Sequence, residues 1–376
     1  MFENLSHFAL QQYWWAIISV LAALFIFLTF VQGGQTLIYS IGKSESQKTI
    51  LLNTLGLKWE ITFTTLVTFG GAFFASFPLF YATSFGGAYW VWLAILAAFI
   101  VQAVSYEFRR KPANLLGAKT YEFLLVINGL LGTLLVGTAV GTFFNGAQFT
   151  LNDMNNVLWQ TPTRGLEAVL TFHNVALGLA VFFLARVLGA LYFILTIEHE
   201  GIVARSKKQL LYNSIAFLAF FLYFVIVLLL KDGFAVNPET GEVFMEEYKY
   251  LHNLVQMPLN AVLFLLGVVG VLWGIASTLY LKSEKGFWFA GVGTVLVVFA
   301  LFIIAGFNNT AFYPSNFDLQ SSLTIQNASS SKFTLVAMSY VSLMIPFVMA
   351  YIIYFWRAMS RNKITEEGMQ KEPHSY

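Results

Sequence analysis

Nine long runs of apolar residues, separated by short polar gaps, account for most of this chain. Each run holds 19 to 25 residues. The hydrocarbon core of a bilayer is about 30 Å thick, and about 20 helical residues cross it. The pattern therefore predicts an all-α polytopic membrane protein, whose nine transmembrane helices lie at roughly 13–31, 61–84, 88–106, 121–145, 173–197, 209–230, 258–281, 286–308 and 333–356.

Positive charge alternates between the gaps and predicts the orientation. Of the 21 Lys and Arg residues, 16 lie in the first, third, fifth and seventh gaps and in the C-terminal tail, and four lie in the other gaps. Cytoplasmic loops carry the excess of Lys and Arg, so we expect the N-terminus outside and the C-terminus in the cytoplasm. The first twelve residues carry neither Lys nor Arg. We therefore expect the first span to be retained, not cleaved as a signal peptide.

Composition narrows the class further. Hydrophobic residues make up 58% of the chain and charged residues 11%, about half the charge of a soluble domain. Topology accounts for the positive residues, so the net charge of +2 does not indicate a nucleic-acid partner. The absence of cysteine excludes disulfides, thiolate metal sites and iron–sulfur clusters. The loops are too short for a soluble domain, so we expect a single membrane domain over residues 1–376, in which residues 358–376 form a flexible cytoplasmic tail.

Polar side chains gather near the predicted cytoplasmic ends of the first four spans. Such groups are expensive in a membrane and usually face protein or water. The candidate members of a polar cluster there are Gln32, Gln35, Trp59, Gln102, Glu107, Arg109 and Glu122.

Glu60 has the pattern of a proton-uptake path. Thr64 and Thr68 follow it at i+4 and i+8, so the carboxylate and two hydroxyls share one helical face. At 1.5 Å per residue the stripe reaches about 12 Å into the membrane. A transporter could use the same groups for a cation. In the structural alternative, the Thr hydroxyls bond to the i−4 carbonyls and Glu60 stabilises the helix start.

Two ionisable residues lie apart from that end. Arg186, in the middle of the fifth run, has no acid at i±3 or i±4. We expect its partner on another helix, another subunit or a cofactor, with Glu167 or an acid of spans two to four as the in-chain candidates. His173 is the one histidine at the edge of a span, and a single histidine does not make a haem-binding bundle. We predict no metal ligand and no catalytic residue in this chain.

Small residues and prolines predict local packing. Gly137 and Gly141, like Gly270 and Gly274, place small residues on one helix face, which favours close helix packing within the chain or against a partner. Pro78 and Pro346 lie inside the second and ninth runs, where we expect them to kink the helices.

Three stretches resemble one known family. They are Lys58-Trp59-Glu60 with Gly70 to Tyr81, then Ser105 to Arg109, and then Leu323 to Ser331 with Thr334-Leu335. In this order, and with nine spans, they are similar to subunit II of the bacterial cytochrome bd quinol oxidases over nearly the whole length of the chain.

The resemblance implies a function and partners. The family's complex oxidises quinol and reduces dioxygen to water in the bacterial cytoplasmic (inner) membrane. For the fold, the resemblance implies two four-helix bundles plus one peripheral helix. For the cofactors, it implies b- and d-type haems that a partner, subunit I, ligates. This chain would ligate none, would scaffold subunit I, and would supply a cytoplasmic proton-uptake route through Glu60. A bound quinone, lipid and small single-helix accessory subunits are further expected partners.

The chain departs from the family's pattern in two segments. Gln32-Gly33-Gly34-Gln35 stands where the family has two acids, and Gln102-Ala103 stands where it has Arg-Pro. We hypothesise that an amide and water network replaces an ionic one. Two other readings stay open from the residues alone: a secondary transporter that couples through Glu60 and Arg186, and a purely structural membrane partner.

Overall fold

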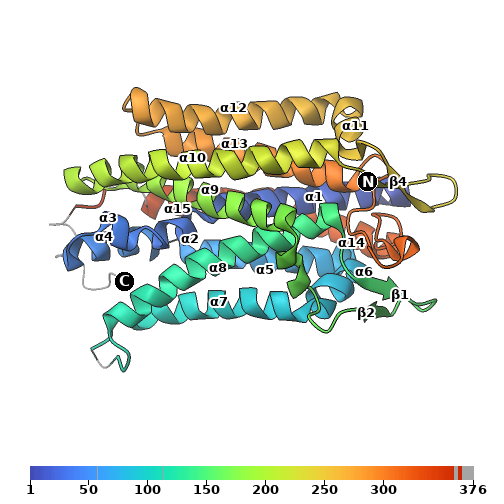
Figure 1. The fold of residues 1–376 in the computed structure, drawn as a ribbon, viewed down its shortest axis with the longest axis horizontal. Coiled ribbons are helices and arrows are strands. Elements are labelled where there is room, and N and C mark those ends of the chain that lie inside the picture. Colours follow the sequence, from blue (N-terminus) through green and yellow to red (C-terminus); the bar gives the residue numbers. More distant parts are fainter. Residues whose placement is uncertain (57, 113, 360–362, 366–376) are drawn as a thin grey trace.

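Long helices lie side by side along the longest axis of the molecule (Figure 1). The computed structural model describes residues 1–56, 58–112, 114–359 and 363–365. The long helices are α1 (His7–Leu28), α5 (Trp59–Ser76), α7 (Tyr89–Phe108), α8 (Ala118–Asn145), α9 (Phe172–Thr196), α10 (Glu200–Leu230), α12 (Pro258–Tyr280) and α13 (Gly286–Gly306). Shorter helices are α2 (Phe30–Gln35), α3 (Ile38–Ile41), α4 (Glu45–Gly56), α6 (Pro78–Phe80), α11 (Lys249–Gln256), α14 (Lys332–Ser342) and α15 (Ile345–Met359).

The prediction of membrane-spanning helices is confirmed. Within the described residues, eight helical segments are long and apolar enough to cross a bilayer, and the number becomes nine if one bent pair counts as a single span. That pair, Glu45–Ser76 with Pro78–Gly87, coincides with the second predicted run. The grouping into two four-helix bundles and the sidedness of the termini stay predictions.

Both intramembrane prolines coincide with breaks. Helix α5 ends at Ser76, and α6 begins at Pro78 before a π-helical turn over Tyr81–Gly87. Pro346 is the second residue of α15, directly after the break that ends α14 at Ser342. Proline has no N–H to donate, so each break lies where the helical ladder loses a bond.

Small residues let the central helices approach closely. Helix α9 contacts α2, α8, α10 and α13 and is the most buried span. A Cβ at Gly137 of α8 would lie 2.7 Å from the Cα of Gly178 in α9, and one at Gly274 of α12 would lie 2.5 Å from the carbonyl oxygen of Gly286. The small-residue faces predicted from sequence therefore serve packing within the chain.

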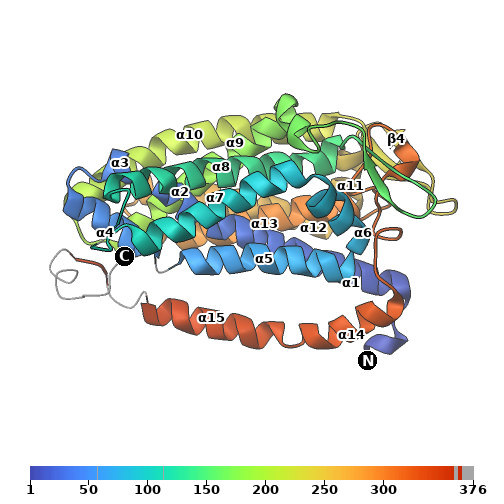
Figure 2. The ribbon, with the colours of Figure 1, turned by 90° about the horizontal axis from the view of Figure 1, so that it is seen from below.

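Helices α14 and α15 run along the outside of this assembly (Figure 2). The segment Lys332–Ala358 is only 11% buried, the lowest share of any span. At its far end, Ile364 exchanges backbone hydrogen bonds with Thr196 and Glu198. Of the predicted flexible tail, residues 358–359 thus belong to α15 and residues 363–365 lie against α9, whereas 360–362 and 366–376 lie outside the described residues.

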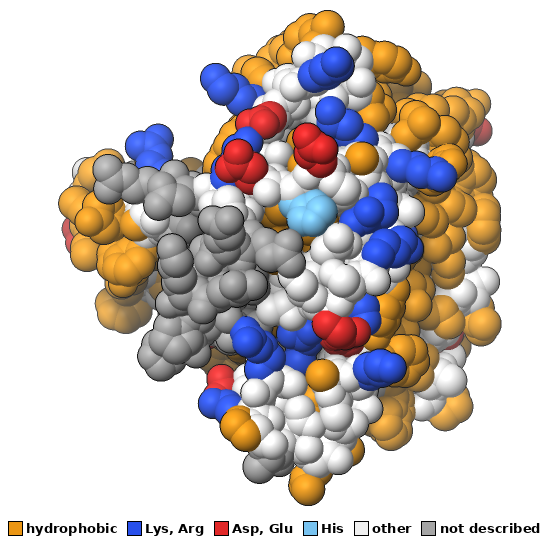
Figure 3. All heavy atoms as spheres, turned by 90° about the vertical axis from the view of Figure 1, so that its left-hand side faces the viewer, with side chains coloured by type: hydrophobic (Ala, Val, Ile, Leu, Met, Phe, Trp, Pro, Cys, Tyr) orange, Lys and Arg blue, Asp and Glu red, His pale blue; other side chains and the backbone are white. Residues whose placement is uncertain are grey.

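The two ends of the molecule differ. The hairpins β1–β2 (Phe149–Leu151 with Val157–Trp159) and β3–β4 (Gly233–Val236 with Val243–Glu246) lie at one end, which we call the hairpin end (Figure 1). Isolated bridges such as Ala147 with Ser315 tie the long loops together there. Lys and Arg side chains gather around the opposite, basic end (Figure 3), which the positive-inside rule predicts to be cytoplasmic.

Candidate functional site

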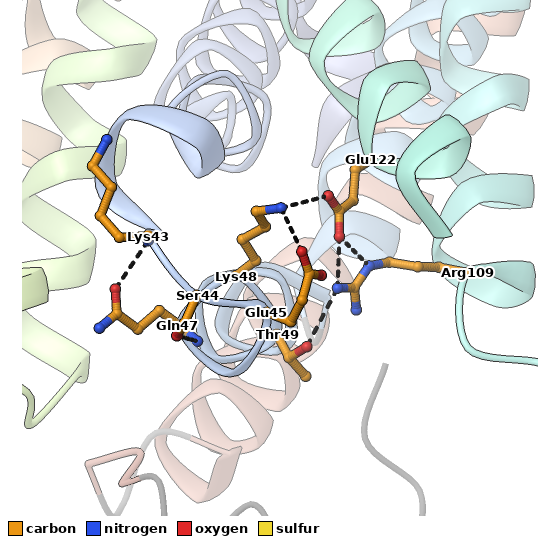
Figure 4. Close-up of polar contacts among 8 residues, drawn as sticks. All are labelled: Lys43, Ser44, Glu45, Gln47, Lys48, Thr49, Arg109 and Glu122. Atoms are coloured by element: carbon orange, nitrogen blue, oxygen red, sulfur yellow. Dashed lines mark hydrogen bonds and ion pairs between the residues drawn. The ribbon is translucent and has the colours of Figure 1, made fainter. Parts of the chain in front are cut away.

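A buried ion cluster joins α4, α7 and α8 at the basic end (Figure 4). The fully buried carboxylate of Glu122 accepts hydrogen bonds from Arg109 Nη2 at 2.8 Å and Nε at 3.1 Å. Lys48 Nζ lies 3.5 Å from the other carboxylate oxygen and 2.8 Å from Glu45. Arg109 also donates to the hydroxyl of Thr49 at 3.3 Å.

This cluster fixes the ends of three helices relative to one another. Arg109 is 5% exposed, so both partners of its pair with Glu122 are removed from water. Removing one partner of a buried pair typically costs about 3–5 kcal/mol, because the other charge is left uncompensated. The Glu122 charge also reaches Tyr39 of α3, whose pKa is raised by burial and by this carboxylate.

A layer of buried amides on α2 and α7 lies further from the basic end than the ion cluster. Gln35 Nε2 donates to the hydroxyl of Tyr106 at 3.0 Å, and Gln32 Nε2 donates to Gln102 Oε1 at 3.3 Å. All three glutamines are 0% exposed. The close approach of α2 to α9 holds them there, since a Cβ at Gly33 would lie 2.0 Å from the carbonyl of Ala185.

The polar groups form a continuous stripe on α7. Arg109, Tyr106, Gln102 and Ala98 follow one another at intervals of three or four residues, and the carbonyl of Ala98 accepts a hydrogen bond from Asn128 Nδ2. This spacing places them on one helix face. At 1.5 Å per residue the stripe extends about 16 Å from the basic end into the helix bundle.

Several buried atoms along this α7 stripe have no protein partner among the described residues: Gln32 Oε1, Gln35 Oε1, Gln102 Nε2, Trp59 Nε1 and Asn128 Oδ1. A buried polar atom left unpaired costs about 1–3 kcal/mol. Ordered water commonly satisfies such groups in protein interiors. The arrangement therefore suits a hydrated amide network, in the segment where the sequence analysis placed one.

Glu60, Thr64 and Thr68 lie on a different face. All three are exposed on the surface of α5. The hydroxyl of Thr68 donates to the carbonyl of Thr64 at 2.8 Å, as the structural alternative anticipated. The neighbouring Trp59 stacks on Tyr106 with 6.0 Å between ring centroids, so the start of α5 connects the exposed carboxylate to the buried stripe.

The structure separates Glu107 from the buried cluster. Glu107 is exposed and pairs with Lys111 at 2.9 Å, one turn further along the chain. An exposed pair of this kind contributes little to stability, because water screens it. Glu107 therefore shares a helix end with Arg109 but not its environment.

Arg186 also has partners other than those expected. Its Nε donates to Asn213 Oδ1 at 2.6 Å, and its Nη1 donates to the hydroxyl of Thr36 at 3.1 Å. The candidate acid Glu167 instead accepts from Thr161, Thr163 and the backbone N–H of Gly165 at the hairpin end. An arginine near the centre of a span thus uses neutral oxygen acceptors, which a search for acids at helical spacing could not reveal.

His173 is enclosed by helix packing. It is 7% exposed, and its ring stacks on Phe224 with centroids 4.6 Å apart. Neither ring nitrogen has a hydrogen-bond partner within the described part of the chain. In that same part, no group of three His, Asp or Glu side chains is placed to hold a metal ion.

A cavity of about 290 Å³ lies at the hairpin end. Its wall includes several aromatic residues, with Phe80, Trp92, Trp159 and Tyr313 among them. Phe85 stacks on Trp92 at 3.9 Å between ring centroids. His173 is not among the lining residues, so the histidine and the cavity are separate features.

The sequence analysis missed part of the site for a physical reason. Lys48, Thr36 and Asn213 become neighbours of the predicted residues only through the packing of α2, α4, α9 and α10. Tyr106 could have been found, because it lies three residues before Arg109 and four after Gln102. That spacing places all three on one helix face.

Several known proteins resemble this chain over nearly its whole length. A sequence model of the family described as "Cytochrome bd terminal oxidase subunit II" matches residues 10–359. Cytochrome bd-I ubiquinol oxidase subunit 2 of Escherichia coli K12 is 25% identical over 377 residues, which covers 96% of this chain and 97% of that protein. A probable cytochrome oxidase subunit 2 of Haemophilus influenzae is 27% identical, with coverages of 96% and 97%. Cytochrome bd ubiquinol oxidase subunit 2 of Bacillus subtilis 168 is 25% identical, with coverages of 98% and 99%.

A solved structure shows the same fold. The bd oxidase from Geobacillus thermodenitrificans contains a chain that aligns with a TM-score of 0.56 and 12% identity, over 93% of this chain and 99% of the other. At this identity the likeness concerns the fold alone. The family resemblance drawn from the sequence motifs is confirmed by the match over residues 10–359. The chain therefore belongs to the cytochrome bd terminal oxidase subunit II family.

Proposed function

We propose that this chain is subunit II of a quinol oxidase that reduces dioxygen to water in a bacterial cytoplasmic membrane. The observation that carries the proposal is the family match over residues 10–359, together with relatives named ubiquinol oxidase subunit 2 that align over nearly their full length. The alternative function, a secondary transporter that couples through Glu60 and Arg186, has no comparable support.

Within the complex, the haem iron belongs to the partner subunit. A histidine that ligates haem iron needs a ring nitrogen that faces a space large enough for the macrocycle. His173 does not fit, because its ring lies against Phe224 and outside the cavity at the hairpin end. We therefore assign the b- and d-type haems to subunit I, and scaffolding to this chain.

Subunit I covers the exposed face of α5. Glu60, Val67 and Phe74 are all exposed along this helix. A carboxylate on a membrane helix is costly unless protein or water surrounds it. The position of Glu60 thus favours a protein partner at this face. The segment Lys332–Ala358, which is 11% buried, offers further exposed surface.

Glu60 then takes up protons from the cytoplasmic side. It lies in the first turn of α5, next to Trp59 and the buried α7 stripe. Its carboxylate can accept a proton at the basic end and pass it into the interface with subunit I. Because the Thr68 hydroxyl donates to the Thr64 carbonyl, water or groups of the partner would complete the route beyond Thr64.

A bound quinone is supported most directly by the cavity at the hairpin end. The aromatic residues in its wall suit a flat ring, and Tyr313 is one of them. We expect the quinone of the membrane to be retained there. Chemical extraction of the purified complex would show more than one quinone per complex if a second site exists outside this chain.

The test is a Glu60→Gln variant of the whole complex, assayed for quinol-driven oxygen consumption. We expect oxygen reduction to slow several-fold, with haem content unchanged, because the amide cannot carry a proton. Glu200→Gln is the matched control: Glu200 is likewise exposed, and it lies in the first turn of α10. Full turnover of Glu60→Gln across pH would exclude Glu60 as an obligatory uptake group, whereas equal losses in both variants would indicate a helix-end effect.

A further inference from the structure

A large cavity separates α15 from the rest of the chain near the basic end. Its volume is about 770 Å³. Its walls come from α1, α5, α9, α13 and α15 and are mostly apolar, with Leu24, Ile61, Leu195, Trp288 and Ile352 among the lining residues. It is distinct from the cavity at the hairpin end and shares no lining residue with it.

Charged side chains lie at one end of this cavity. Arg357, Lys363 and Glu284 are among the lining residues. Lys363 pairs with Glu284 at 2.8 Å, so these two charges offset each other. Arg357, exposed in the last turn of α15, has no ion pair within the described residues and leaves this end positive.

A second cation, Lys58, lies behind one of the lining residues. Lys58 precedes the first residue of α5 and lies one turn before Ile61, which lines the wall. Its side chain is 1% exposed, and its ammonium lies 5.4 Å from the centre of the Trp356 ring, another lining residue. In the described part of the chain, no carboxylate or hydrogen-bond acceptor contacts this ammonium.

Arg357 and Lys58 both lack an anionic partner within the described residues. A buried ammonium without a counter-charge is costly, and the face of an aromatic ring compensates only a part of that cost. The cavity beside it is apolar and bounded by membrane helices. A molecule that combines a negative head with long apolar chains satisfies both features, whereas a free anion satisfies only the first.

We propose that this cavity holds an anionic phospholipid, with its acyl chains between α15 and the body of the chain. Its phosphate lies against Arg357 and on the side of Lys58, whose ammonium is separated from the cavity by the Trp356 ring. The low burial of α15 follows from this arrangement, since lipid replaces side chains as the packing partner of its inner face. Residues 363–365, held by backbone hydrogen bonds to α9, bring Lys363 to the same opening. The lipid thus fastens the outermost helix to the helices that it flanks.

The test uses the purified complex, stripped of lipid and then titrated with either dioleoyl phosphatidylglycerol or dioleoyl phosphatidylcholine. Native mass spectrometry counts the phospholipids retained. We expect the phosphatidylglycerol to be held at least ten-fold more tightly than the phosphatidylcholine, and the preference to fall towards one in a Lys58→Gln/Arg357→Gln variant. The control, Lys207→Gln/Lys208→Gln, removes two charges from α10 at the same end and should keep the preference.

A second variant tests the cavity without changing charge. Ile352→Trp fills the space between α15 and the body, so it should reduce the retention of both lipids. Three results would overturn the proposal: a wild-type complex that holds no phospholipid, as expected if quinone or another subunit fills the cavity; equal affinity for the two lipids; or unchanged retention in Ile352→Trp.

Discussion

At the scale of single residues, the basic end combines two kinds of buried polar chemistry. The Arg109–Glu122 pair is ionic and is satisfied from several sides. The amide layer on α2 and α7 is neutral. Each of its glutamines makes one hydrogen bond and leaves its other amide atom without a partner among the described residues. An amide tolerates such partial pairing, whereas a carboxylate at the same depth would need a full counter-charge.

A Gln35→Asp variant tests this difference. Gln35 is 0% exposed, and its amide nitrogen contacts the Tyr106 hydroxyl. We expect a destabilisation of about 3 kcal/mol, because a carboxylate buried at this depth needs a counter-charge that a neutral amide does not need. The measurement is the yield and thermal stability of the assembled complex. Gln35→Met, which removes the hydrogen bond without adding charge, should cost less, and wild-type behaviour of Gln35→Asp would refute the amide network.

The sequence predicted which residues belong to this site better than it predicted which of them contact one another. The amides, Arg109 and Glu122 were recognisable because polar groups in a membrane are rare. Their pairing was not, since Glu122 meets Arg109 and Lys48 across three helices. Arg186 shows the limit most clearly: its partners Asn213 and Thr36 are neutral, and no charge pattern indicates them.

At the scale of helices, the positions of small residues decide how closely the spans pack. In the membrane the hydrophobic effect does not drive helix against helix, so close van der Waals contact matters more. Helices α8 and α9 meet at Gly137 and Gly178, and α12 and α13 meet at Gly267 and Gly293. Periodicity predicted the helices and the glycine faces, but which helix lies opposite each face depends on the three-dimensional arrangement.

Two glycine-to-alanine substitutions in α8 distinguish the effect of close helix packing from the effect of helix propensity. A Cβ at Gly137 would lie 2.7 Å from the backbone of Gly178, whereas one at Gly132 meets its nearest atom at an ordinary 3.5 Å. We expect Gly137→Ala to lower the thermal stability of the complex, with an overpacking cost of about 1–3 kcal/mol. Gly132→Ala should match wild type or exceed it, because alanine is the better helix former. A loss shared equally by both variants would contradict the packing argument.

At the scale of the whole molecule, the two faces flanking the core expose different side chains. The α5 face carries the exposed Glu60, whereas α12 exposes apolar side chains such as Leu265 and Val269. Lipid can cover the second face directly, but the first is better suited to protein. The chain contains no cysteine, so a single introduced thiol reports on one position.

Cysteine labelling can locate the partner surface. Val67 of α5 and Val269 of α12 are 55% and 61% exposed in the isolated chain. In the detergent-solubilised complex, we expect Val67→Cys to be protected from a maleimide and Val269→Cys to react, with labelling after denaturation as the reference. Fast reaction at Val67→Cys would show that subunit I does not cover the α5 face.

The most direct test of the whole account is a reduced-minus-oxidised absorption spectrum of this chain, purified with and without its co-expressed partner subunit. The account predicts bands of b- and d-type haem only when the partner is present, since His173 is packed against Phe224. Haem bands from the chain alone would contradict it, and a colourless preparation in both cases would remove the quinol oxidase assignment itself.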